Sequence, residues 1–217
     1  MNAYRLYFSP GACSLAAHIV LEETGAPFEL ISVPVAEGAN LQPGYLAVNP
    51  KGRVPALAIP GEPRVLTELP AIVTLIARRH YQTLAMLPTA PVDEARCHEW
   101  FAWLAGWVHG VGFGGLWRPA RFVAEVSLHA AVSAHARQTI EAAFAQIEST
   151  LTDGCSYALP CGYTIVDPFL LVLYRWGMRI GLPMGDRYQA WTASARRVVE
   201  RPAVQRALHS EGISLEI

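Results

Sequence analysis

The chain of 217 residues carries a cysteine where a strand is expected to give way to a helix. Cys13 closes the segment 9–13 (Ser-Pro-Gly-Ala-Cys), between an expected strand at 4–8 and an expected helix at 14–24. The unpaired N–H groups at a helix start carry partial positive charge, so they stabilise a thiolate, whether of the cysteine or of another anionic sulfur. A cysteine also fills tight turns as a small residue, so both interpretations of Cys13 stay open at this point.

Two further candidates stand at the ends of expected strands. A cis bond between Val54 and Pro55 would turn the N–H and C=O of Val54 outward, ready to pair with an extended peptide, although Pro55 also fits a plain strand start. Glu68 precedes a helix expected at 70–80, so a carboxylate stands beside free backbone N–H groups. That mixture suits a zwitterionic amino-acid head group, and a simple favourable contact of Glu68 with the helix dipole explains it equally.

The fourth candidate is a histidine inside a largely apolar helical segment. His109 follows Trp103, Trp107 and Val108, which recur at helical spacing. A lone histidine in such surroundings is more often structural than catalytic, so His109 needs support from elsewhere in the chain.

Composition excludes several classes of function. With 17 basic and 18 acidic residues and no basic cluster, the chain offers no field for nucleic acid or an anionic membrane. The uncharged run 101–117 holds five glycines and is too short for a membrane span, and no secretory signal precedes the first strand. We expect a cytoplasmic protein with reduced thiols and no metal site, because no metal-ligand spacing or CxxC pair links Cys13, Cys97, Cys155 and Cys161.

The order of expected elements predicts two domains. Residues 1–82 read as strand 4–8, helix 14–24 closed by Gly25, strand 28–33, a hairpin of 55–59 with 64–66, and helix 70–80. This βαβ-ββα order is that of an α/β thioredoxin-like domain. A linker at 83–91 leads to an all-α domain at 92–217, with helices expected at 128–151, 168–176, 188–200 and 203–209. Before the second of these, Thr164-Ile165-Val166-Asp167 resembles a capping box, which we interpret as structural.

Together these motifs resemble the cytosolic glutathione S-transferases, specifically the bacterial beta class. The matching segments of the first domain are 4–14, 49–57 and 66–68. Those of the second are Glu99-Trp100, His109, Arg118-Pro119, 163–167 and 200–205. The resemblance spans nearly the whole chain and implies the glutathione transferase fold, which is the thioredoxin-like domain followed by the helical one.

The resemblance implies an enzyme with one site on which the four candidates converge. Cys13 would lie near the sulfur of glutathione, the co-substrate, and Val54 would pair through its backbone with the cysteinyl unit, with Pro55 cis. Glu68 would meet the γ-glutamyl ammonium. His109 would reach the same site from the second domain, so Cys13 and His109 are the expected catalytic residues.

Beside this site the resemblance implies a pocket for a hydrophobic electrophile, to which glutathione is conjugated, and a homodimer. Phe113 and Trp117 are the candidates for that pocket. Two alternatives remain: glutathione-dependent thiol–disulfide exchange, in which Cys13 attacks, and a non-catalytic binding protein that keeps the fold.

Several residues depart from the family pattern around glutathione. Leu69 and Pro70 replace a residue whose hydroxyl meets the γ-glutamyl carboxylate, and Pro70 has no N–H, so the N–H of Leu69 is the remaining donor. The loop 34–44 contains Glu37 but no lysine for the glycyl carboxylate, and Arg53 is the candidate to supply that charge. Further departures are Phe8, Ala102 and Gly110.

Overall fold

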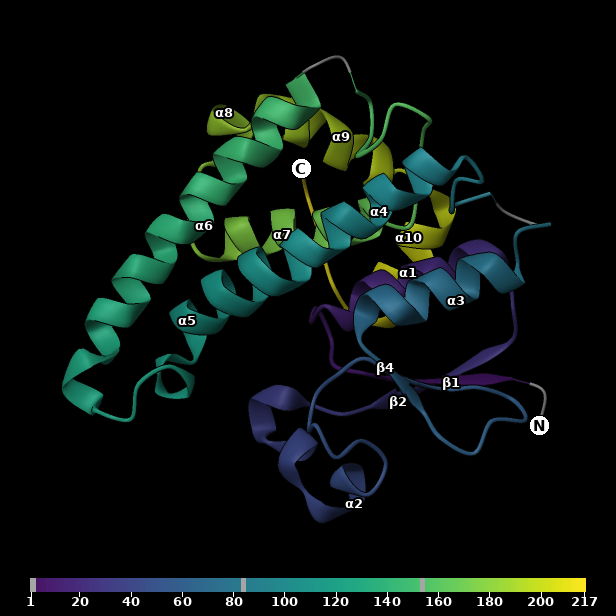
Figure 1. Ribbon diagram of the computed structural model, residues 1–217, viewed down its shortest axis with the longest axis horizontal. Coiled ribbons are helices and arrows are strands. Elements are labelled where there is room, and N and C mark those ends of the chain that lie inside the picture. Colours follow the sequence, from purple (N-terminus) through teal and green to yellow (C-terminus); the bar gives the residue numbers. More distant parts are fainter. Residues whose placement is uncertain (1–2, 83–84, 153–154) are drawn as a thin grey trace.

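The computed structural model describes residues 3–82, 85–152 and 155–217, and a four-stranded sheet lies in the first part. Its strands are β1 (Tyr4–Phe8), β2 (Phe28–Ser32), β3 (Ala56–Ala58) and β4 (Leu66–Thr67), in the order β2-β1-β3-β4 (Figure 1). β1 pairs in parallel with β2 and antiparallel with β3, which pairs antiparallel with β4. The predicted βαβ unit and the predicted hairpin are both confirmed.

Two helices, α1 (Ser14–Thr24) and α3 (Leu69–Arg79), pack side by side on one face of this sheet, while the short α2 (Pro43–Leu46) lies on its other side (Figure 1). The alternate residues Tyr4, Leu6 and Phe8 of β1 are buried, as their spacing predicts. Helix α1 has the predicted bounds, and Gly25 closes it in the left-handed conformation at φ 65°.

In the described residues after α3, seven α-helices follow, together with a π-helical stretch, η3 (Leu104–Phe113). They are α4 (Pro91–Trp103), α5 (Gly114–Trp117), α6 (His129–Thr152), α7 (Asp167–Arg179), α8 (Met184–Arg187), α9 (Gln189–Val199) and α10 (Pro202–Ser210). Helices α7 and α10 pack against α1, which explains why α1 is buried nearly all round. Within the described ranges no helix is both long and apolar enough to cross a membrane. Residues 83 and 84 of the predicted linker lie outside the described residues.

The predicted capping motif is confirmed at the start of α7. The buried carboxylate of Asp167 accepts hydrogen bonds from the N–H of Thr164 at 2.7 Å, from its hydroxyl at 3.1 Å and from the N–H of Ala158 at 2.8 Å. Burial nevertheless raises the pKa of Asp167 to about 6. The motif therefore anchors α7 and takes no part in the site described below.

The π-helix was not predicted, and glycines account for its close packing against α6. A Cβ on Gly112 would lie 2.9 Å from Cγ1 of Ile140, and a Cβ on Gly115 would lie 2.9 Å from Cβ of Ala136. The absent side chains let the segment 104–117 approach α6 closely. His109 lies in the middle of this π-helix, a geometry that is frequent at functional sites.

The loop between β1 and α1 is tied to the C-terminal part of the chain. The N–H of Gly11 donates to the carboxylate of Glu211 at 2.8 Å, and its C=O accepts from Nε1 of Trp176 at 2.9 Å. The other oxygen of Glu211 lies 2.9 Å from Nδ1 of His18 in α1. Glycine is required here, because φ is 66° and a Cβ would lie 2.5 Å from Nη1 of Arg175.

Candidate functional site

A cavity of about 300 Å³ lies between the N-terminal α/β part and the segment 105–122. Every predicted site residue lines it, although these residues come from four separate stretches of sequence. They are Cys13, Arg53, Val54, Pro55, Glu68, Leu69 and His109. Phe113 and Trp117, predicted for a second pocket, line the same cavity.

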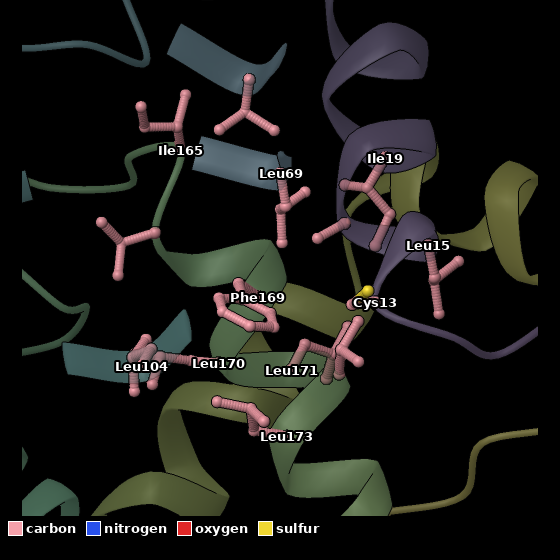
Figure 2. Close-up of a cluster of buried hydrophobic side chains, with 14 of the residues drawn as sticks. Cys13, Leu15, Ile19, Leu69, Leu104, Ile165, Phe169, Leu170, Leu171 and Leu173 are labelled. Atoms are coloured by element: carbon pink, nitrogen blue, oxygen red, sulfur yellow. The ribbon is translucent and has the colours of Figure 1, made fainter. Parts of the chain in front are cut away.

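Cys13 caps α1 but is not a thiolate. Its Sγ donates to the carbonyl oxygen of Val54 at 3.4 Å, and only 7% of the residue is exposed. Cys13 belongs to a buried apolar cluster that includes Leu69 and Phe169 (Figure 2). Burial raises the pKa of the Cys13 thiol to about 12, and the nearby charge of Glu68 adds to the rise. Of the two interpretations left open for Cys13, the structure favours a buried, protonated thiol, because desolvation outweighs the partial charge of the helix start.

The peptide bond between Val54 and Pro55 is cis, as predicted. The carbonyl of the preceding Arg53 accepts 2.7 Å hydrogen bonds from the hydroxyl of Tyr45 and from Nδ2 of Asn49, which fix the turn. Among the described residues the N–H of Val54 meets no acceptor. The backbone of Val54 is thus held rigidly at the cavity with a donor available to an extended ligand.

Glu68 has a backbone conformation that was not predicted from the residues around it. Its φ is 73°, the one positive value among the non-glycine residues that the structure describes. Such a conformation costs on the order of 1–3 kcal/mol and is concentrated at functional sites. Its carboxylate lies 2.7 Å from Nζ of Lys51, which also contacts Oγ1 of Thr67 at 2.9 Å. Lys51 thus occupies the position expected for a ligand ammonium.

Helix α3 begins directly after Glu68 and turns its first N–H groups toward the same region. The N–H groups of Leu69 and Ala71 have no acceptor within the described chain, and Pro70 has no N–H. A helix start of this kind stabilises a carboxylate. Leu69 is therefore placed as the resemblance implies, with the backbone rather than a side chain as donor.

His109 reaches the cavity from the π-helix, with its ring packed edge-on against two aromatic side chains. The ring centroids lie 5.0 Å from Trp176 and 6.2 Å from Phe169. The pKa of His109 is lowered to about 4. Burial is the main cause, and the positive charges of Arg53, Arg118 and Arg121 contribute to the same shift. His109 is consequently neutral near pH 7.

Two arginines of the cavity were not predicted as site residues. Arg118 and Arg121 both line it, next to Trp117 and Phe122. In the sequence, Arg118-Pro119 was identified only as a segment that resembles the glutathione S-transferases. The detectable signal was a pair of arginines on either side of Pro119, because a proline favours the first position of a helical turn.

Comparison with known proteins agrees with this geometry. The family model for the N-terminal domain of glutathione S-transferases matches residues 10–79. Glutathione S-transferase GstA of Escherichia coli O157:H7 is 33% identical over 96% of this chain and 99% of its own. A glutathione transferase homologue from Sulfitobacter with bound glutathione superposes with a TM-score of 0.90 at 29% identity, covering 99% of this chain and 100% of its own.

A beta-class glutathione S-transferase of Sphingomonas chungbukensis gives a TM-score of 0.83 at 30% identity, covering 97% of this chain and 100% of its own. Sequence identity of this level over nearly the whole length and a shared fold lead to the same conclusion. The chain belongs to the glutathione S-transferase family of enzymes.

Proposed function

We propose that this protein binds reduced glutathione in the cavity described above and transfers it to an electrophilic carbon of a hydrophobic molecule. The observation that carries the proposal is the convergence of Cys13, Val54, Glu68 and His109 on one cavity. Neighbours in the comparisons, including the Sulfitobacter homologue with bound glutathione, support the choice of ligand.

The groups lining the cavity match the parts of glutathione one by one. The free N–H of Val54 pairs with the cysteinyl unit, and the carboxylate of Glu68 takes the γ-glutamyl ammonium in place of Lys51. The N–H of Leu69 at the start of α3 binds the γ-glutamyl carboxylate. Arg53 supplies the charge for the glycyl carboxylate.

The reacting sulfur in this proposal belongs to glutathione. Because Cys13 stays protonated, its S–H is able to turn from the carbonyl of Val54 and donate to a bound thiolate. The positive charge of Arg118 favours the same thiolate. The thiolate attacks the electrophilic carbon, so that a carbon–sulfur bond forms while the bond to the leaving group breaks and the leaving group keeps the electron pair.

Neutral His109 has a modest part in this scheme. An imidazole with a pKa of about 4 carries no positive charge at pH 7, so it acts as a hydrogen-bonding group beside the sulfur. The same scheme does not favour thiol–disulfide exchange, because a thiol with a pKa of about 12 is a poor attacking group at neutral pH.

We further infer that the two domains of the chain bind different substrates. Residues 1–82 bind glutathione, residues 83–91 connect, and residues 92–217 supply the apolar wall for the electrophile. Phe113 and Trp117 belong to that wall, with their ring centroids 4.8 Å apart. The homodimer stays a prediction from the family resemblance.

Titration calorimetry with reduced glutathione, followed by a conjugation assay with a panel of aryl halides and unsaturated ketones, tests the proposal. We expect saturable binding and a thioether product identified by its mass. The proposal would be contradicted if the protein did not bind glutathione at millimolar concentration and formed no conjugate with any compound of the panel. Binding without conjugation would instead favour the non-catalytic alternative.

A further inference from the structure

The cavity carries an excess of positive charge that the chain as a whole lacks. Its charged lining consists of one carboxylate, Glu68, and of Lys51, Arg53, Arg118 and Arg121. The net charge of the whole chain is −1, so the excess is local. Lys51 pairs with Glu68, whereas the three arginines have no carboxylate partner among the described residues.

Two of these arginines come from a single turn. The N–H of Arg121 donates to the carbonyl of Arg118 at 3.0 Å, which closes a 3₁₀ turn at Pro119–Arg121. Arg118 directly precedes this turn and Arg121 is its last residue, and both line the cavity. Burial and the charges of Arg118 and Arg53 lower the pKa of Arg121, as close like charges must.

The surroundings of this pair are aromatic. Trp117 precedes Arg118 and is 41% exposed, and Phe122 follows Arg121 and is 49% exposed. Phe122 also lies over the backbone of Gly114, since a Cβ there would be 3.6 Å from its ring. Flat apolar surface beside two unpaired guanidinium groups fits a planar molecule with an anionic substituent.

Neither carboxylate of glutathione pairs with these two arginines, and Arg118 acts on its sulfur only through its charge. In the proposed binding mode its glycyl carboxylate faces Arg53 and its γ-glutamyl carboxylate faces the start of α3, both on the N-terminal wall. Arg118 and Arg121 lie on the opposite wall, in the segment that we assign to the electrophile. We propose that Arg118 and Arg121 form an anion subsite for the second substrate, and that this substrate is a flat electrophile carrying a carboxylate. This inference rests on the proposed function.

A matched pair of electrophiles tests the subsite. A chlorodinitrobenzoate with chlorine para to the carboxylate reacts with glutathione thiolate by forming the aryl carbon–sulfur bond and releasing chloride. Its methyl ester reacts in the same way but carries no charge. We expect the ratio of kcat/KM for the acid over the ester to fall by roughly tenfold or more in R118Q/R121Q, the effect of losing charge-assisted hydrogen bonds.

Three controls make the outcome unambiguous. R64Q removes an exposed arginine outside the cavity and should leave the ratio unchanged. R118K/R121K keeps both charges and should recover part of it, and added salt should lower the ratio in the unmodified protein and in R118K/R121K but not in R118Q/R121Q. Circular dichroism and Tm verify folding, and R121Q alone provides a milder variant.

Each contrary result has its own meaning. An equal loss for acid and ester, or a rise in the KM of glutathione alone, would overturn the anion subsite while leaving the proposed function intact. Absence of conjugation for both compounds in the unmodified protein would instead contradict the proposed function itself.

Discussion

The thiol of Cys13 and the carbonyl oxygen of Val54 lie 3.4 Å apart, and this hydrogen bond joins the start of α1 to the turn that holds the cis Val54-Pro55 bond. Both groups face the cavity from buried or half-buried positions. The contact fits the proposal that Cys13 donates a hydrogen bond to the sulfur of glutathione and does not attack the electrophile.

We therefore expect Cys13→Ala to keep conjugation activity within about tenfold, since the loss is that of one weak donor. The measurement is kcat/KM for glutathione conjugation at neutral pH. In the unmodified protein, iodoacetamide should label Cys13 slowly, because the thiol with a pKa of about 12 stays protonated. Complete loss of conjugation in this variant would show that Cys13 itself does the chemistry.

The carboxylate of Glu68 should matter for ligand binding and little for stability. Its side chain and that of Lys51 are 60% and 53% exposed, so their ion pair contributes little to folding. Glu68→Gln should raise the dissociation constant of glutathione about tenfold, through loss of one charged hydrogen bond, while Tm stays unchanged.

Glu62→Gln is the matched control for Glu68, because it removes an exposed carboxylate in the turn between β3 and β4, outside the cavity. Calorimetric titration of both variants compares them directly. Equal affinity of the two variants would remove Glu68 from the binding site.

His109 should make the stability of the protein depend on pH in the acid range. Its pKa is about 4 in the folded protein and 6.5 when unperturbed, so between these values the unfolded chain binds more protons. The free energy of unfolding therefore falls as the pH is lowered from about 6.5 to about 4. We expect this loss to amount to about 2 kcal/mol and to be missing in His109→Gln.

The measurement is urea unfolding of both proteins across this range, with the difference between them taken at each pH. Taking the difference is necessary because Asp167, whose pKa of about 6 is raised, contributes with the opposite sign between pH 3.8 and 6. His135→Gln, on the exposed side of α6, is the control and should follow the unmodified protein. A parallel pH profile for His109→Gln would refute the burial of a neutral imidazole.

The close approach of the π-helix to α6 predicts a strong contrast between two glycines of η3. Gly112→Ala would place a Cβ 2.9 Å from the buried Ile140, which should destabilise the protein by about 1–3 kcal/mol. Gly106→Ala meets nothing within 4 Å and should be neutral or stabilising. Thermal unfolding of the two variants separates crowding from helix propensity, and equal effects would argue against the packing described here.

Local patterns predicted much of the fold and the membership of the site. The alternation of apolar residues in β1 predicted the bounds of the first strand, and Gly25 predicted the end of the first helix. Both signals are local, because each lies within or directly beside the element that it defines. The resemblance then placed seven residues in one site, and all seven line one cavity.

Properties that depend on packing between distant segments were not predictable in this way. The pKa of Cys13 depends on burial by Leu69 and Phe169, and that of His109 on arginines from two parts of the chain. The positive φ of Glu68 and the π-helix likewise have no local composition signal. Sequence therefore located the reacting groups more reliably than it described their protonation.

The bond between Gly11 and Glu211 has a consequence for the order in which the site is assembled. The two residues are 200 positions apart, so the loop that leads into Cys13 gains this hydrogen bond only after nearly all of the chain has left the ribosome. The sheet and α1 are synthesised long before that moment. The loop beside the cavity is therefore fixed late in biosynthesis, when the carboxylate of Glu211 accepts its hydrogen bond from the N–H of Gly11.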